Sequence, residues 1–431
     1  MTSKRISTPK TIGVVGLGYV GLPLSLTFCE AGLSVIGFDI DPAKPKALAK
    51  GQTYLKTIPA ERIAAQVKAG RFTATTDFKR VREVDALIYC VPTPLTHHRE
   101  PDMSFIEKTA RATAPFVHEG MLVVLESTTW PGTTDEVVRP IIEEAAGLKA
   151  NRDFFLAFSP EREDPGNEHF TTATIPKVVG ADTKEALKRA VALYGSAFKT
   201  IVPVSSTRAA EMVKLYENTF RAVNIALANE VKLLCERMGL DVFEIIQAAA
   251  TKPFGFMPFY PGPGLGGHCI PIDPFYLTWK AREFDFPTKF IELAGEINTA
   301  MPYHVVEVLR RGLADQGKSI KGAKVLILGV AYKRDVDDQR ESPSLKIMSL
   351  LEREGARVAY HDPHIPKIGK TREYSFDLSS VSLTPKNLAA FDAALIITDH
   401  RAVDYDLVVK HAKLVVDTRN VVPAGGKVIR A

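Results

Sequence analysis

Cysteine is scarce in this 431-residue chain, which contains only Cys29, Cys90, Cys235 and Cys269. Their spacing matches neither a zinc cluster nor a disulfide-rich secreted domain, so we expect no metal site and a reducing, cytoplasmic location. The apolar segment 12–28 is interrupted by glycine and proline, and no signal-cleavage pattern follows it. No segment approaches the roughly 20 uninterrupted apolar residues of a membrane span. A soluble protein is therefore expected.

Clusters of like charge are also missing. The net charge of +5 is spread along the chain, which argues against a nucleic-acid surface and suits a small anionic ligand better. There is no low-complexity tract or tandem repeat. The apolar fraction of 45% and the charged fraction of 24% are typical of a globular protein. A chain of this length predicts two or three domains.

The first half of the sequence alternates short apolar segments with helical ones, as in a doubly wound parallel sheet. The predicted strands are residues 12–15, 34–39, 86–91, 122–126 and 154–158. Several of these strands end in polar turns, which contain Asp39, Thr93, Ser127, Thr128, Thr129 and the segment 159–161. Because ligands of open α/β sheets bind beyond the carboxyl ends of the strands, these turns should converge on one crevice.

A glycine motif, Gly16-Leu17-Gly18-Tyr19-Val20-Gly21, follows the first predicted strand and opens a predicted helix. Free N–H groups at such a helix N-terminus bind a pyrophosphate. Asp39 follows at the spacing of the acidic residue that accepts from the ribose hydroxyls, and its charge would repel a 2′-phosphate. The motif therefore predicts an NAD site, with a glycine turn that binds nothing as the alternative.

The sequence pattern changes in the middle of the chain, from alternating strands and helices to a long helical segment. Residues 209–238 contain no glycine or proline and keep apolar residues at helical spacing, which predicts one helix of roughly 45 Å that ends near Gly239. Lys214 and Asn218 lie one turn apart on it, so they share a face. They could stabilise an oxyanion or form a solvated pair. The apolar face of this helix is a candidate dimer interface or ordinary core.

A second α/β block follows a polar stretch at residues 311–322. Its predicted strands are residues 324–329, 357–361, 393–398 and 414–417, with a helix at 344–354. The expected fold is α/β, with two Rossmann-like doubly wound domains joined by a long central helix and a helical middle. The expected domains are an NAD-binding domain at 1–206, a central helical domain at 207–310 and a C-terminal substrate-binding domain at 311–431.

One cysteine stands in an unusual context. Cys269 follows the glycine-rich segment 261–267, and Asp273 lies four residues beyond it. Glycines allow a backbone to approach a ligand closely, so the thiol is a candidate nucleophile. A buried structural cysteine is the alternative.

Two charged segments are further candidates. Residues 159–164 could supply a general base, and Glu161 is preferred to Glu163 because it is nearer the strand end. Lys333, Arg334 and Arg340 follow a strand of the second block and could bind a diphosphate or a carboxylate. An exposed charged loop would have the same composition.

Together these segments resemble the UDP-glucose/GDP-mannose dehydrogenase family almost from end to end, and within it most closely the bacterial UDP-N-acetylglucosamine 6-dehydrogenases. The family resemblance is carried by residues 13–23, 126–128, 159–161, 210–214 with Asn218, 266–269 with Asp273, and 329–333. The closer one is carried by residues 159–166 and 252–269.

The resemblance implies a four-electron oxidation of the C6 alcohol of a UDP-sugar to the carboxylate, with two NAD reduced, in polysaccharide biosynthesis. Cys269 would add to the C6 aldehyde, and the thiohemiacetal would be oxidised to a thioester. Lys214 and Asn218 would stabilise the oxyanions. Asp273 and Thr128 would position a water, and Glu161 would assist hydrolysis.

The resemblance also implies the ligand contacts. The cofactor would meet Gly16, Gly18, Tyr19, Val20, Gly21, Asp39, Thr93, Ser127, Thr128 and Arg340. The sugar nucleotide would meet Glu161, Arg162, Lys214, Asn218, Tyr260, Gly266 and Lys333, in a homodimer or a larger homo-oligomer.

One position departs from the family pattern. Relatives acting on UDP-glucose tend to carry an arginine in the loop before the cysteine, where this chain has Pro253 beside Lys252. This favours UDP-N-acetylglucosamine over UDP-glucose, with UDP-N-acetylmannosamine and UDP-N-acetylgalactosamine as further alternatives.

Two other readings compete. A two-electron hydroxyacid-type dehydrogenase would need neither Cys269 nor the second α/β block. An NAD-binding sensor would need none of Cys269, Lys214, Asn218 and Glu161.

Overall fold

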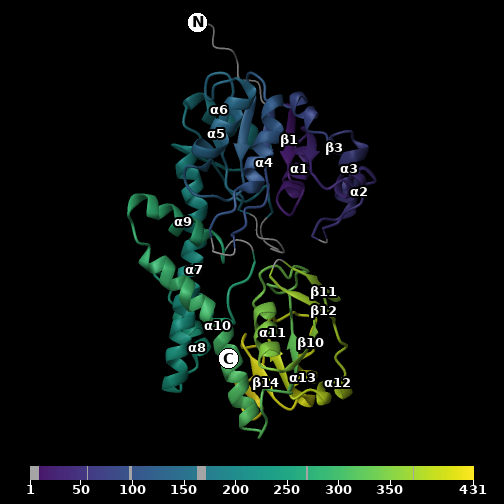
Figure 1. The fold of residues 1–431 in the computed structure, drawn as a ribbon, viewed down its shortest axis with the longest axis vertical. Helices are drawn as coiled ribbons and strands as arrows, with labels where there is room; N and C mark the ends of the chain where they lie inside the picture. Colours follow the sequence, from purple (N-terminus) through teal and green to yellow (C-terminus); the bar gives the residue numbers. More distant parts are fainter. Residues whose placement is uncertain (1–8, 56, 97–99, 163–170, 268–269, 372) are drawn as a thin grey trace. The chain divides into compact units, whose positions relative to one another are not determined.

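The computed structural model describes residues 9–55, 57–96, 100–162, 171–267, 270–371 and 373–431. The chain forms two compact units. Unit 1 comprises residues 1–217 and 275–286, and unit 2 comprises residues 218–274 and 287–431. Figure 1 shows the course of the chain through both.

Unit 1 is built on an eight-stranded sheet of order β3-β2-β1-β4-β5-β6-β7-β8, in which only the β6–β7 pair is antiparallel. The strands are β1 Thr11–Val15, β2 Ser34–Phe38, β3 Phe72–Thr75, β4 Ala86–Tyr89, β5 Leu122–Leu125, β6 Phe155–Phe158, β7 Lys177–Gly180 and β8 Ile201–Val204. The first six have the Rossmann order, which reverses between β1 and β4. The five strands predicted for this half are confirmed, and β3, β7 and β8 are additional.

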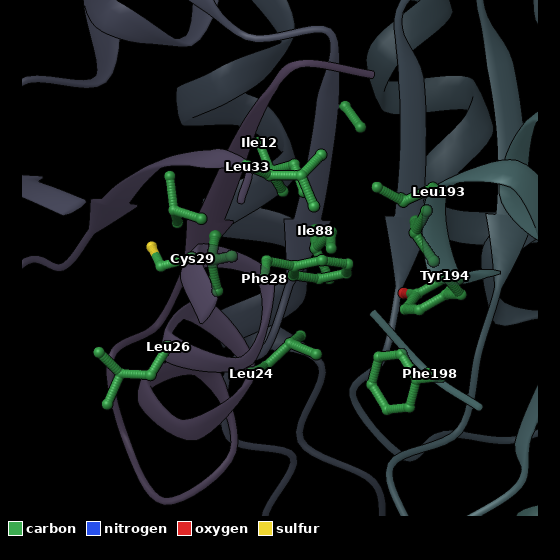
Figure 2. Close-up of a cluster of buried hydrophobic side chains, with 14 of the residues drawn as sticks. Ile12, Leu24, Leu26, Phe28, Cys29, Leu33, Ile88, Leu193, Tyr194 and Phe198 are labelled. Carbon is green, nitrogen blue, oxygen red and sulfur yellow. The ribbon is translucent and has the colours of Figure 1, made fainter. Parts of the chain in front are cut away.

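Helices cover both faces of this sheet (Figure 1). They are α1 Gly21–Glu30, α2 Ala43–Ala49, α3 Ala60–Lys68, α4 Ser104–Thr113, α5 Arg139–Ala146 and α6 Lys184–Gly195, with short turns η1 Phe78–Glu83, η2 Ala114–Phe116 and η3 Thr134–Val138. On one face, Phe28 of α1 packs against Tyr194 of α6 and against Phe198, with ring centroids 5.9 and 6.2 Å away (Figure 2). On the other, the Tyr89 hydroxyl lies 2.6 Å from the Thr113 hydroxyl of α4.

The middle of the chain is helical. Its helices are α7 Thr207–Met238, α8 Val242–Ala250, α9 Asp273–Ala281, η4 Arg282–Phe284 and α10 Lys289–Ala314. The predicted long helix is confirmed, and it starts two residues earlier than expected. It ends before Gly239, whose φ of +70° suits a glycine after a helix. Helix α10 runs four residues into the stretch expected to connect the second block, because Leu309, Gly312 and Leu313 are buried.

Unit 2 contains a five-stranded parallel sheet of order β10-β9-β13-β14-β15. Its strands are β9 Lys324–Leu328, β10 Arg357–His361, β13 Ala393–Ile396, β14 Val415–Asp417 and β15 Val428–Arg430, and a separate hairpin pairs β11 Lys367–Lys370 with β12 Ser375–Ser379. The helices are α11 Pro343–Arg353, α12 Pro385–Ala390 and α13 Tyr405–His411. Apolar clusters cover both faces of the sheet. The four strands and the helix predicted here are confirmed.

The two sheets share one turn geometry. Gly16 after β1 and Gly329 after β9 have φ of +95° and +83°. Each donates its N–H to the last residue of the neighbouring strand, Phe38 or His361, at 2.8 and 2.9 Å. A side chain on either glycine would meet a carbonyl oxygen within 2.4 Å. The Rossmann-like turn therefore occurs twice in the chain.

No helix in the described part of the chain combines the length and the apolar character that a bilayer crossing requires.

Candidate functional site

The glycine motif of unit 1 leaves space for a ligand. A Cβ on Gly21 would lie 1.9 Å from the Gly16 carbonyl oxygen, so this glycine lets α1 pack on the turn. A Cβ on Gly18 would meet nothing within 4 Å. No side chain caps α1 at Val20, while the Leu22 N–H already donates to the Gly18 carbonyl at 3.2 Å and Pro23 has no N–H. The Gly21 N–H and the positive end of the helix dipole are what this helix start offers an anion. Tyr19 and Val20 are partly buried at this turn.

Asp39 lies directly after β2, as the sequence indicated, and is 5% exposed. One carboxylate oxygen accepts from the Leu17 N–H at 2.9 Å and from the Lys44 ammonium at 2.8 Å. The Tyr54 hydroxyl donates to the Leu17 carbonyl at 2.6 Å. Lys44 and Tyr54 were not predicted, because their position beside the turn is set by the packing of the segment after β2.

The ends of β4 and β5 meet through a serine. The Ser127 hydroxyl donates to the Val91 carbonyl at 2.8 Å and accepts from the Val91 N–H at 3.0 Å. Thr93 and Thr128 are half-buried near these strand ends, while Thr129 is fully buried. Within the described part of the chain the Thr129 hydroxyl has no hydrogen-bond partner.

Glu161 and Lys214 lie together in unit 1. The Lys214 ammonium donates to the Glu161 carbonyl at 2.5 Å and lies 3.4 Å from its carboxylate, and Lys214 is 4% exposed. Arg162 donates to the Pro176 carbonyl at 2.8 Å and to the Glu217 carboxylate at 2.6 Å. The end of β6 is thus fixed to α7. Glu163, the rejected candidate, lies outside the described residues.

Glu211, one turn before Lys214, was not singled out on its own. Its carboxylate accepts from the N–H of Gly132 at 2.5 Å and from the N–H and hydroxyl of Thr134 at 2.9 and 2.7 Å. It is fully buried, and this burial raises the pKa of the Glu211 carboxyl to about 7 against the effect of these donors. The carboxylate joins the loop after Thr128 to α7.

In unit 2, Asn218 and Asp273 form a second buried group. Asn218 is 1% and Asp273 3% exposed. The Asn218 amide nitrogen donates to the Asp273 carboxylate, and Arg221 donates to the Asn218 carbonyl oxygen. These contacts fix the orientation of the amide. Cys269, the predicted nucleophile, lies outside the described residues.

The glycine-rich loop packs closely in unit 2. A Cβ on Gly266 would lie 3.0 Å from Cβ of Tyr332, so a larger residue would displace this loop. Lys333, next to Tyr332, is half-buried. Arg340 donates to Asp338 at 2.6 Å. Tyr260 is 48% exposed and stacks on Phe243.

Arg419 is a cation that the sequence did not reveal. Its Nε donates to the Ile397 carbonyl at 2.8 Å, and a Cβ on Gly262 would lie 2.7 Å from its guanidinium. Burial, and then repulsion by Arg334, lower the pKa of Arg419 to about 10. A desolvated guanidinium beside a glycine loop suits an anionic ligand.

The described cysteines do not offer an evident nucleophile. Burial raises the pKa of the Cys29 thiol to about 12, which disfavours the thiolate. Cys235 is 5% exposed, within an apolar cluster of α7 and α8. Cys90 is half-buried.

One group of possible metal ligands, Asp335, His364 and His400, occurs among the described residues. The ring nitrogens of His400 are already engaged. Nδ1 accepts from the Asp335 N–H at 2.9 Å, and Nε2 lies 3.1 Å from the Asp362 carboxylate. The arrangement fits a hydrogen-bond network that holds the segment around Lys333.

Comparison with known proteins gives matches along most of the chain. Three models of the UDP-glucose/GDP-mannose dehydrogenase family match it: the NAD binding domain at residues 10–198, the central domain at 208–300 and the UDP binding domain at 326–424.

Individual relatives match over nearly their whole length. A UDP-N-acetyl-D-mannosamine dehydrogenase of Pyrococcus horikoshii is 34% identical over 95% of this chain and 96% of its own. A UDP-N-acetyl-D-glucosamine 6-dehydrogenase of Pseudomonas aeruginosa is 33% identical over 90% of each chain. Among solved structures, the P. horikoshii UDP-D-ManNAc dehydrogenase has a TM-score of 0.88 at 32% identity, over 97% of this chain and 98% of its own.

Proposed function

The chain belongs to the UDP-glucose/GDP-mannose dehydrogenase family of NAD-dependent UDP-sugar dehydrogenases, and we propose that it carries out both oxidation steps at C6 of UDP-N-acetylglucosamine. The proposal rests on one observation above all. The buried ammonium of Lys214 contacts Glu161, and the buried amide of Asn218 follows Lys214 by four residues on the same helix.

The residues of unit 1 fit NAD. Gly18 leaves room for the pyrophosphate, Gly16 and Gly21 shape the turn, and the N-terminal end of α1 would face the pyrophosphate with its positive dipole. Asp39 would accept from the adenosine ribose once Lys44 turns away, and Thr93, Ser127 and Thr128 would line the nicotinamide end. When bound, NAD accepts the hydride in each oxidation.

Lys214 and Asn218 would stabilise negative charge on the C6 oxygen. An ammonium and an amide already held in place need little rearrangement as that charge develops, which is the basis of oxyanion stabilisation. Asp273 fixes the amide so that its nitrogen is the donor side. Together with Thr128, it would position a water for proton transfer.

Cys269 would hold the aldehyde between the oxidations. Its thiolate adds to the aldehyde carbon, and the C–S bond forms as the carbonyl electron pair moves to oxygen. Loss of hydride from that carbon gives the thioester. Glu161 then takes a proton from water, water oxygen bonds to the carbon, and the C–S bond breaks to return the thiolate. Alcohol, water and two NAD become carboxylate, two NADH and three protons.

The second unit would bind the UDP part. Lys333 and Arg419 supply cations for the diphosphate. Gly266, Tyr260 and Arg162 are the remaining proposed substrate contacts, and Arg340 is the proposed cofactor contact from this unit. We retain the three-part division at residues 206 and 310 as a functional proposal, since the cofactor, oxyanion and UDP roles fall in its successive parts.

The identity of the sugar is the most specific part of the proposed function. Relatives of similar identity are named for N-acetylmannosamine and for N-acetylglucosamine. The segments 159–166 and 252–269, together with Pro253, favour N-acetylglucosamine. A cytoplasmic location and a role in polysaccharide biosynthesis remain predictions, supported by the proposed need for a reduced thiol and by the uronic acid product.

The test is an assay of purified protein with NAD and four UDP-sugars: N-acetylglucosamine, N-acetylmannosamine, N-acetylgalactosamine and glucose. We expect the highest kcat/KM with the first and two NADH formed per sugar consumed. One NADH per sugar would instead indicate a two-electron dehydrogenase. A different preferred sugar would overturn the substrate but leave the chemistry.

A further inference from the structure

Glu126 belongs to the segments that carry the family resemblance, yet the proposed mechanism gives it no role. It directly follows β5 and is 2% exposed. The Lys177 ammonium donates to one of its carboxylate oxygens at 2.8 Å, and the Tyr194 hydroxyl donates to the other at 2.5 Å. Burial, and then the nearby carboxylate, raise the pKa of Tyr194 well above its usual value, so this hydroxyl stays a donor.

Lys177 is buried, and the groups recorded around its ammonium suit a cation. Its side chain is 7% exposed, and its ammonium lies 5.1 Å from the Tyr194 ring centroid and 5.6 Å from that of Phe198. In Figure 2 both rings lie below Leu193, and they meet edge to face with their centroids 5.8 Å apart. The ammonium also donates to the Pro160 carbonyl at 3.3 Å.

Pro160 is the residue before Glu161, so two buried lysines hold successive carbonyl oxygens. Lys177 contacts that of Pro160, and Lys214 contacts that of Glu161 at 2.5 Å. Lys214 comes from α7, while Lys177 starts β7 and is fixed by the carboxylate at the end of β5. The peptide that carries the Glu161 side chain is therefore held from two sides.

Several of the same residues border one small, partly open cavity. Glu126, Glu161, Lys177 and Phe198 line it together with Val20 of the glycine motif. Removal of the Lys177 ammonium would leave the Pro160 carbonyl without this donor and would add space beside it. The end of β6 could then shift into the cavity.

We propose that the Glu126–Lys177 ion pair is a positioning device that holds Glu161 where it acts on water in the hydrolytic step. The inference rests on the proposed function, which assigns that step to Glu161. Since both oxidations precede hydrolysis, a misplaced Glu161 slows the release of the acid and leaves the first two hydride transfers fast.

The experiment is rapid-mixing kinetics of Lys177→Met with NAD and the preferred UDP-sugar. We expect a burst approaching two NADH per active site, at a rate within about twofold of the unaltered protein, followed by a steady rate at least about tenfold lower. A burst and a steady rate that fall together would overturn the proposal, because loss of folded protein lowers both.

A second variant separates an effect on the position of Glu161 from an effect on the stability of the fold. Lys177→Met alone leaves a buried, unpaired carboxylate, so its Tm should fall. Glu126→Gln/Lys177→Met has no buried charge, and we expect it to regain most of the Tm but not the steady rate. Recovery of both would show that the pair has only a structural role.

Two controls complete the design. Arg80→Met/Glu83→Gln removes an exposed ion pair of unit 1 and should change neither phase. The unaltered protein must form two NADH per sugar. Failure there would contradict the proposed function, whereas failure of the variants alone contradicts only this inference.

Discussion

Buried carboxylates determine the local geometry of unit 1 at the scale of single residues. Asp39, Glu126 and Glu211 each join chain segments distant in sequence, through backbone N–H groups or a lysine. Breaking such contacts leaves an unsatisfied buried group, which costs more than an exposed hydrogen bond is worth. These residues should therefore be sensitive to substitution.

The raised pKa of Glu211 predicts a pH-dependent stability. Its pKa is about 7 in the folded protein against an ordinary 4.5, so the folded state binds the extra proton. Stability from this group is present below pH 4.5 and is lost as the pH rises to 7, by about 3 kcal/mol. In urea unfolding from pH 4.5 to 8, Glu211→Gln should lack this decline.

The matched control for that series is Glu144→Gln, an exposed carboxylate of α5. Its curve should follow that of the unaltered protein. An unchanged decline in Glu211→Gln would refute the assignment of the pH effect to this carboxyl.

Asp39 should act mainly on cofactor binding. Asp39→Ala removes the acceptor for the ribose and for the Leu17 N–H, so the KM for NAD should rise roughly 10- to 100-fold with a smaller change in kcat. Steady-state kinetics with varied NAD measure this. Asp41→Ala, two residues on and exposed, should leave the KM nearly unchanged, and an equal effect of both variants would contradict the assignment.

At the scale of elements, the sequence was informative wherever the signal is local. Hydrophobic periodicity, together with the glycines and prolines that end elements, predicts the strands before Gly16 and Asp39 and the helix α7. Strand β8 was missed because Pro203 and the exposed Val202 interrupt its pattern. Strand β7 was missed because it is short and begins at a lysine.

The site residues also fall into those that a local motif predicts and those that only the fold brings together. The glycine turn and Asp39 could be predicted, because their spacing in the sequence is the motif. Glu126 and Lys177 are 51 residues apart, and Arg419 lies beside a glycine 157 residues earlier, so only the fold brings them together. The position of Cys269, on which the chemistry depends, stays a prediction.

Helix α7 also predicts an interface. Phe220, Leu227, Leu234 and Met238 are 42–61% exposed and recur at intervals of seven, seven and four residues. Such a stripe suits pairing with a second copy of the same helix. We expect the protein to sediment as a dimer or a larger oligomer.

Leu227→Glu/Leu234→Glu should dissociate that oligomer, because it places charges in the apolar stripe. Sedimentation velocity measures the change. Arg237→Glu, which adds a carboxylate at an exposed position outside the stripe, is the control. An unchanged sedimentation coefficient in the double variant would exclude this surface as the interface.

At the scale of the whole molecule, the proposed chemistry requires Cys269. Cys269→Ser should abolish steady turnover while NAD binding is kept, because the cofactor residues of unit 1 are unaltered. Turnover is measured by NADH absorbance and binding by calorimetry. Full activity in this variant would remove the covalent mechanism, and loss of NAD binding would show a wider structural effect.

The duplicated turn has a consequence for stoichiometry. After β9, the N–H groups of Val330 and Ala331 already donate to one oxygen of the Asp362 carboxylate, with N···O distances of 2.8 and 3.0 Å. The next helix, α11, starts only at Pro343, and the Ser342 hydroxyl already caps its N-terminus by accepting from the Ser344 N–H at 3.3 Å. A saturating calorimetric titration should therefore count one NAD per polypeptide, and a count of two would mean that the look-alike turn also accepts a coenzyme.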